Sequence, residues 1–159
     1  MAPPVPPAVI SRDDDGGVTV RAVRLEEPLS FDGRLDDRIY SQTPSMSGFI
    51  QMEPDEGAPA TEETEAWIFF DDENVYIAAR CWDSHPERMV ENDMQRDGHN
   101  IGRNENFAVI LDTFYDRRNG YLFHTNPLGG LYDAQVTDEQ NTNSDWNTVW
   151  EVKTGRFTE

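Results

Sequence analysis

Short runs rich in apolar, aromatic and β-branched residues recur along the chain, between clusters of glycine, proline, asparagine and aspartate. The two clearest runs, residues 65–70 and 75–82, flank an acidic turn at residues 71–74. Such runs are typical of β-strands, in which successive side chains point to opposite faces of a sheet. Two strand-like runs around a short turn predict a β-hairpin.

The same pattern predicts further strands elsewhere, whereas no long segment has the 3.6-residue period of an amphipathic helix. One short helical turn is expected at residues 36–40. The additional strands are expected at residues 18–23, 46–52, 106–112, 121–126, 131–136 and 148–154, with a polar loop at 138–145. Short strands with turn residues between them predict an all-β fold, an antiparallel β-sandwich or barrel.

The length of 159 residues fits one domain with a single core. Residues 1–17 are rich in proline and aspartate, which predicts a flexible tail. Residues 18–159 are then the β-sandwich. The chain stops at Glu159, directly after a Gly-Arg-Phe run that resembles the approach to a turn, so the predicted sandwich lacks its C-terminal strands.

The charge balance excludes several classes of partner. Acidic residues number 31 and basic residues 13, which gives a net charge of -18. A surface this negative repels phosphate backbones and anionic lipid headgroups, so neither nucleic acid nor a membrane surface is expected as a partner. No apolar run approaches the roughly 20 residues of a membrane helix. The composition is compatible with cations and with neutral ligands such as sugars.

The single cysteine, Cys81, excludes an internal disulfide, and its strand-like surroundings predict a small buried side chain. No signal-peptide pattern precedes the domain, and the Pro-rich start could be what remains after such a segment has been removed.

Acidic turns are the candidate metal ligands. Asp112 and Asp116 flank one turn, between a strand end and an Asn-Gly pair. A hard cation such as Ca²⁺ takes several oxygen ligands from carboxylates and loop carbonyls, so these two residues are the predicted calcium ligands. The alternative is that they are solvated turn residues of a very acidic protein.

Four tryptophans are the candidate sugar-stacking residues, because a pyranose packs its apolar C–H face against an aromatic ring. Trp67 and Trp82 lie inside predicted strands, where a place in the core is favoured. Trp146 follows a polar loop, and both a core position and an exposed binding position stay open for it. No nucleophile, phosphate-binding or dinucleotide motif is present, so the chain is not expected to be an enzyme.

One run of residues resembles the opening motif of a known family. Residues 30–37 read Ser-Phe-Asp-Gly-Arg-Leu-Asp-Asp and are followed by Ile39-Tyr40, with Tyr40 at a place where tryptophan is usual. This is similar to the start of family 9 carbohydrate-binding modules. Further segments fit the same pattern, at residues 70–78, 110–112, 116–121 and 123–129. The last two resemble one branch, the N-terminal domain of large bacterial envelope proteins with a barrel-like C-terminal part.

The resemblance covers roughly residues 23–157 and implies a β-sandwich of the DOMON-like, immunoglobulin-like jelly-roll type. Relatives clamp a glucan or xylan end between two tryptophans and hold Ca²⁺. Residues 101–104 contain no tryptophan where the first clamp residue is expected, and the second would lie beyond Glu159. Residues that contact sugar in the family align with His124 and Asn126. These two alternate with Phe123, so we expect them to face a groove while Phe123 packs in the core.

The function implied is a non-catalytic carbohydrate-binding accessory domain, associated with polysaccharide binding and breakdown in a larger periplasmic, outer-membrane-associated or secreted protein. Glycoside hydrolase activity would attach to the parent protein by association only. An alternative is a structural or docking domain of an outer-membrane barrel protein, without a sugar ligand and without membrane insertion of this segment. A remote alternative is haem binding, with candidate ligands that have no diagnostic spacing: Met46, Met52, Met94, His99 and His124.

Overall fold

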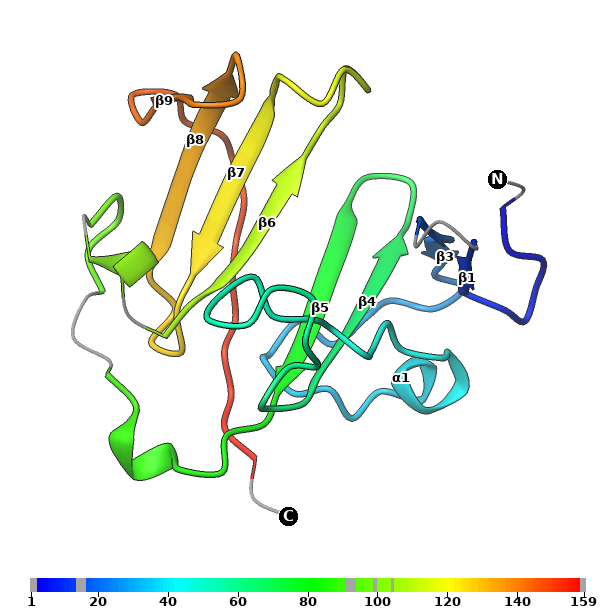
Figure 1. Cartoon of the computed structure of the whole chain (residues 1–159). Helices are drawn as coiled ribbons and strands as arrows, with labels where there is room; N and C mark the ends of the chain where they lie inside the picture. The colour runs from blue at the N-terminus through cyan, green and yellow to red at the C-terminus, as the bar shows by residue number, and fades with distance from the viewer. Residues whose placement is uncertain (1–2, 14–16, 91–93, 99, 104, 158–159) are drawn as a thin grey trace. The chain divides into compact units, whose positions relative to one another are not determined.

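The protein is built almost entirely of β-strands. The computed structural model describes residues 3–13, 17–90, 94–98, 100–103 and 105–157. Within these ranges, nine strands form three sheets, with one short α-helix, α1 (Arg38–Gln42), and two 3-10 turns, Pro86–Arg88 and Ile101–Arg103 (Figure 1). The all-β class predicted from short strand-like runs with turn residues between them is therefore confirmed, and pairing is antiparallel in every sheet except for the short β3 strand.

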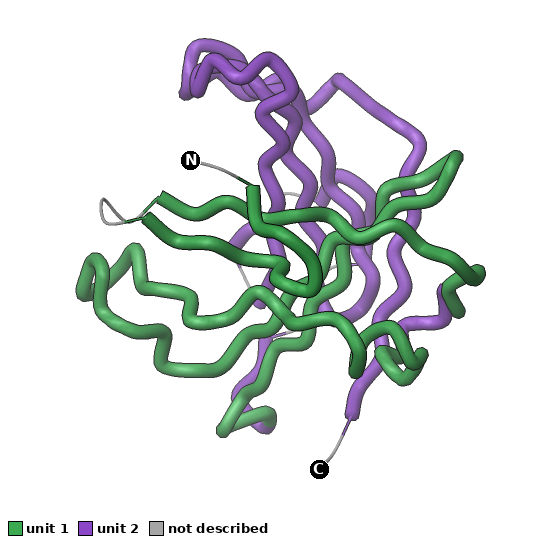
Figure 2. Tube along the Cα trace, turned by 90° about the vertical axis from the view of Figure 1, so that its right-hand side faces the viewer, with its two compact units in different colours: residues 1–30, 34–86 green, residues 31–33, 87–159 purple. Residues whose placement is uncertain are grey.

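The backbone forms two compact units (Figure 2). Unit 1 comprises residues 1–30 and 34–86, and unit 2 comprises residues 31–33 and 87–159. Unit 1 begins with a hairpin of β1 (Ile10–Arg12) and β2 (Val18–Val20). The segment expected to be a flexible tail thus contributes a strand, because Ile10 to Arg12 pair with the apolar run that follows. Residues 1–2 and 14–16 of that tail lie outside the described residues.

The main sheet of unit 1 has the order β3–β4–β5, formed by Val23–Arg24, Thr64–Phe70 and Val75–Cys81. β4 and β5 are the predicted hairpin, paired from Thr64↔Cys81 to Phe70↔Val75. The turn is closed by Asp71, whose carboxylate accepts the backbone N–H groups of Glu73 at 2.8 Å and Asn74 at 2.7 Å. These bonds stabilise the ionised carboxylate and so lower the pKa of Asp71, and the bond from Glu73 has the largest effect.

The core of unit 1 is a cluster of three buried aromatic rings. Tyr40 of α1 meets Trp67 and Phe69 of β4 edge to face, at centroid distances of 5.4 and 5.5 Å. The buried Trp67 indole N–H donates to the Thr43 carbonyl at 3.0 Å, so its polar group is satisfied. The helical turn and the core position of Trp67 are both as predicted. The prediction that Cys81 is buried is wrong, because this side chain lies exposed at the end of β5.

Unit 2 contains one antiparallel sheet in the order β6–β7–β8–β9. Its strands are Phe107–Leu111, Gly120–Thr125, Leu131–Thr137 and Asn141–Asn143. Opposed residues of paired strands share a face. Tyr121 and Phe123 of β7 therefore share a face with Asp133 of β8, which we call the aromatic face, whereas His124 points to the opposite face.

Two predicted strands are wrong. Residues 148–154 form no strand, because the N–H of Thr148 donates to the carboxylate of Asp133 at 2.8 Å instead of to a neighbouring strand. Residues 46–52 contribute only the isolated bridges Met46↔Ala66 and Ile50↔Pro59. Conversely, β9 lies within the stretch expected to be a polar loop.

The aromatic core of unit 1 predicts a large effect of truncating Phe69. Phe69→Ala should lower the free energy of unfolding by about 3–5 kcal/mol, through lost burial and the cavity that remains. The phenylalanine at position 49 is 44% exposed, so Phe49→Ala should cost less than about 1 kcal/mol. Urea denaturation of both variants and the wild type measures this difference. Equal losses in the two variants would contradict the assignment of the core.

Candidate functional site

An aromatic cluster covers part of the aromatic face of unit 2. Trp146 stacks on Tyr121, with ring centroids 4.6 Å apart and planes at 26°. Trp146 also meets Phe123 edge to face at 6.3 Å, and Trp150 meets Phe123 at 5.3 Å. Trp146 is half-buried. This is the arrangement that a stacking platform requires, namely one aromatic ring supported from behind by another.

Amide side chains continue the row that starts at Tyr121. Gln135 of β8 lies opposite Tyr121, and Asn143 of β9 lies opposite Gln135, so all three share the aromatic face. Asn143 is exposed and its Oδ1 accepts the N–H of Asp145 at 3.1 Å, next to Trp146 in sequence. Amide groups both donate and accept hydrogen bonds, as ligand hydroxyl groups do.

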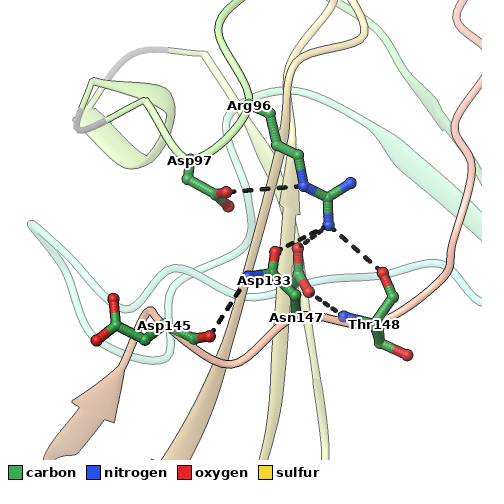
Figure 3. A network of polar contacts seen from close by, with 6 residues as sticks. All are labelled: Arg96, Asp97, Asp133, Asp145, Asn147 and Thr148. Atoms are coloured by element: carbon green, nitrogen blue, oxygen red, sulfur yellow. Dashed lines mark hydrogen bonds and ion pairs between the residues drawn. The ribbon is translucent and has the colours of Figure 1, made fainter.

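A network of polar contacts lies on the same face (Figure 3). The Asp133 side chain is completely buried. Its Oδ1 accepts a hydrogen bond from Arg96 Nη2 at 2.8 Å, and its Oδ2 accepts the N–H of Thr148 at 2.8 Å. A buried carboxylate needs such partners, since an uncompensated charge in the interior is strongly destabilising. The network therefore joins three segments that are distant in sequence.

Arg96 extends this network toward the segment that carries Trp146. Its Nη2 also donates to Asn147 Oδ1 at 3.2 Å and to the Thr148 carbonyl at 3.4 Å. On the other side, Arg96 Nε lies 3.7 Å from the carboxylate of Asp97. Sequence reasoning missed Arg96 and Asp133. The one available signal was an aspartate in the middle of the strand predicted at residues 131–136, where a charged side chain is unusual.

His124 lies on the opposite face of the sheet from Trp146. Its ring meets Tyr132 of β8 edge to face at 5.7 Å. Gly102 lies so close that a Cβ there would be 3.2 Å from His124 Nδ1. That nitrogen is buried without a hydrogen-bond partner among the described residues. Burial lowers the pKa of His124, because it penalises the charged imidazolium.

Asn126 is buried within a turn. Its Oδ1 accepts the N–H of Leu128 at 3.1 Å and that of Gly130 at 2.9 Å, and Gly129 between them has the positive φ of 80° that glycine tolerates. The structure thus gives the asparagine oxygen a role in the Asn-Pro-Leu-Gly turn. The three residues predicted to bind sugar, His124, Asn126 and Trp146, are not brought together on one surface.

Asp112 and Asp116 organise the exposed loop between β6 and β7. Asp112 accepts the N–H groups of Phe114, Asp116 and Arg117 at 2.7–3.3 Å. Asp116 accepts the side-chain amide of Asn119 at 2.6 Å, which together with N–H groups of the loop lowers the pKa of Asp116. Among the residues that the structure describes, no three His, Cys, Asp or Glu side chains gather as metal ligands.

Of the residues considered for haem ligation, Met52 and Met94 are 87% and 70% exposed. Met46 belongs to unit 1 and the half-buried His124 to unit 2, and His99 lies outside the described residues.

Unit 1 has a hollow of its own, with a volume of about 460 Å³. Arg80 lies in its wall, over the rings of Trp67 and Trp82 at 5.8 and 5.7 Å, and 3.6 Å from the carboxylate of Glu65. Ser45 Oγ donates to Glu65 Oε1 at 2.8 Å. The aromatic rings that line this hollow, Tyr40 and Trp67, are buried in the core, so they offer little free ring surface to a ligand.

Comparisons with protein-family models, curated proteins and solved structures found no match to this chain. The resemblance to family 9 carbohydrate-binding modules therefore stays a prediction from the sequence motifs. In the described part of the chain, no helix has the length and apolar character needed to cross a membrane.

The half-buried His124 predicts a pH dependence of stability. The unfolded chain takes up a proton near the usual histidine pKa of 6.5, whereas folded His124 takes it up only at lower pH. The contribution of His124 to stability is therefore complete above about pH 6.5 and is lost as pH falls from there toward the folded pKa. Chemical denaturation of wild type and His124→Gln at pH 7 and pH 5 measures it. The variant should lose less stability on acidification.

The control for this measurement is His85→Gln, which replaces an exposed histidine. This variant should show the wild-type decline. If His124→Gln and His85→Gln lose the same stability between pH 7 and pH 5, the neutral state of His124 is not what makes the fold sensitive to acid.

Proposed function

We propose that this protein is a non-catalytic carbohydrate-binding domain and that it binds sugar on the aromatic face of unit 2. The observation that carries the proposal is the half-buried Trp146, stacked on Tyr121 at 4.6 Å. A pyranose ring presents flat C–H surfaces, and an indole ring supported from behind by a second ring matches such a surface. Removing this apolar area from water would supply the main part of the binding energy.

The polar groups beside Trp146 favour a neutral sugar. Gln135 and Asn143 continue the row of Tyr121, and their amides can exchange hydrogen bonds with hydroxyl groups. The net charge of -18 disfavours phosphorylated or carboxylated glycans through long-range repulsion. Neutral polysaccharides such as glucan or xylan, which the family resemblance also implies, are therefore the proposed ligands.

This proposal keeps one of the three residues predicted to contact sugar and replaces the other two. Trp146 stays, whereas Asn126 uses its oxygen to hold a turn and His124 lies on the opposite face of β7. Tyr121, Gln135 and Asn143 take their places. In the proposed role, which involves binding without catalysis, the aromatic rings of this face supply stacking surface and its amides supply hydrogen bonds.

The platform predicts the effect of removing Trp146. In isothermal titration with cellohexaose and xylohexaose, Trp146→Ala should weaken binding by at least tenfold, about 1.4 kcal/mol, through loss of the stacking surface. Trp82→Ala is the matched control, because Trp82 is also half-buried but belongs to unit 1. It should bind as the wild type does. A glycan array that captures no neutral glycan, or equal affinities of the two variants, would contradict the proposal.

A structural Ca²⁺ ion at Asp112 and Asp116 is a separate part of the proposal. Both carboxylates are exposed and lie in one loop, linked by the bond from the Asp116 N–H to Asp112 Oδ1 at 3.3 Å. A metal that binds only the folded state raises its stability by mass action. Thermal melts in EDTA and in millimolar Ca²⁺ should therefore differ by several degrees, and the difference should vanish in Asp112→Asn. If the wild-type melting curves in EDTA and in Ca²⁺ superpose, the proposed calcium site in this loop is wrong.

A further inference from the structure

The buried carboxylate of Asp133 lies beneath the segment that carries Trp146. Asp133 Oδ2 accepts the N–H of Thr148, which comes two residues after Trp146 and two before Trp150 (Figure 3). We infer that the Asp133–Arg96 pair is the device that positions Trp146 on Tyr121 and thereby builds the binding platform. The part of this inference that concerns sugar binding rests on the proposed function, whereas the positioning of Trp146 rests on the contacts described here.

Backbone pairing does not hold this segment in place. Residues 145–150 belong to no strand, and they are joined in no β-ladder to β8 or β9. The described contacts that attach them to the rest of unit 2 are the rings of Trp146 and Trp150 on β7, the bond from the Asp145 N–H to Asn143 Oδ1, and the polar bonds of Asp133 and Arg96. The bond at Asp145 joins near neighbours in the chain, whereas the bonds to Thr148 tie the segment to β8 and to Arg96, so the bonds to Thr148 define its position along the sheet.

Asp133 and Arg96 bind both polar groups of the Thr148 backbone. Asp133 accepts from the N–H of Thr148, while Arg96 Nη2 donates to the carbonyl of the same residue at 3.4 Å and to Asn147 Oδ1 at 3.2 Å. Hydrogen bonds to charged groups are stronger than those between neutral groups. Arg96 has a second effect, because its positive charge compensates the buried carboxylate of Asp133. The Asp133 carboxylate can therefore stay buried and accept the Thr148 N–H.

Asp133 cannot contact a ligand itself, because its side chain is completely buried. Its role is to position Trp146, and losing the pair should release the segment and take Trp146 off Tyr121 while every residue of the platform stays present. A merely structural role, by contrast, would lower global stability and leave the Trp146–Tyr121 contact intact in the folded molecules.

The decisive variant is Asp133→Leu combined with Arg96→Met. Removing both charges of the pair together leaves neither Asp133 nor Arg96 as an unpaired charge, a change that folded proteins often tolerate. The Asp97 carboxylate, 3.7 Å from Arg96 Nε, loses its ion pair, but its side chain is 34% exposed. The double substitution also removes the acceptor for the Thr148 N–H. The matched control is Asp138→Asn combined with Arg118→Met, which removes an exposed ion pair of 2.7 Å in the same unit and places at Asp138, with its φ of 52°, a residue that tolerates this conformation. NMR measures two signals in each protein, the hydrogen exchange rate of the Thr148 amide and the nuclear Overhauser contacts between Trp146 and Tyr121.

In the wild type, the Thr148 amide should exchange at least tenfold more slowly than that of Val149, whose side chain is 99% exposed. The Asp133/Arg96 double variant should lose this protection and the ring contacts, and the control should keep both. Arg96→Gln, a smaller change, supplies the same readout if the double variant does not fold. Equal exchange of Thr148 and Val149 in the wild type, or retained ring contacts in the variants, would overturn the inference.

Binding of cellohexaose and xylohexaose separates this inference from the proposed function. If no glycan binds the wild type while the two NMR signals change as expected in the double variant, the proposed sugar binding is wrong and the positioning role of Asp133 is supported. If the wild type and the double variant bind glycan with the same affinity, the positioning role is wrong and the proposed function is supported. Trp146→Ala should weaken binding at least tenfold while the Arg96–Asp133 pair stays intact, as expected if the pair acts on binding only through the position of Trp146.

Discussion

Unit 2 depends on the burial of one carboxylate. Asp133 lies in the middle of β8 with no exposed surface, and an ionised group can stay there only if both of its oxygens have partners. Arg96 supplies one and the Thr148 N–H the other. Meeting this requirement brings segments from before β6 and after β9 onto the same face of the sheet. Trp146 and Trp150 reach Tyr121 and Phe123 because the chain between them is tied to Asp133.

The pleat of β7 separates two kinds of chemistry. Tyr121 and Phe123 point to the face that the tryptophans cover, whereas His124 points to the other and packs against Tyr132. On the proposed function, a sugar on the aromatic face would meet indole, phenol and amide groups. Recognition would then depend on shape and neutral hydrogen bonds, while the net charge of -18 repels anionic ligands.

Local interactions explain which predictions succeeded. The hairpin of β4 and β5 is predictable because two runs of β-forming residues flank a turn closed by Asp71, two and three residues from its partners. The strands around residues 107–111, 120–125 and 131–137 follow from similar β-rich runs between turn residues. The strand expected at residues 148–154 failed for a reason outside that segment, since its first amide is bonded to an aspartate 15 positions earlier.

By itself the sequence determined the all-β class, the main strands and the turns, because side-chain alternation and turn hydrogen bonds act between near neighbours. It also singled out Trp146, with its role left open. Only the tertiary structure decided that Trp146 stacks on Tyr121, that the Asn126 side-chain oxygen bonds within a turn and that His124 points to the face opposite Trp146. Arg96 and Asp133 are 37 positions apart, and no local pattern indicates which of the 31 acidic residues will be buried and paired. That choice follows from strand register and packing, which the folded chain establishes as a whole.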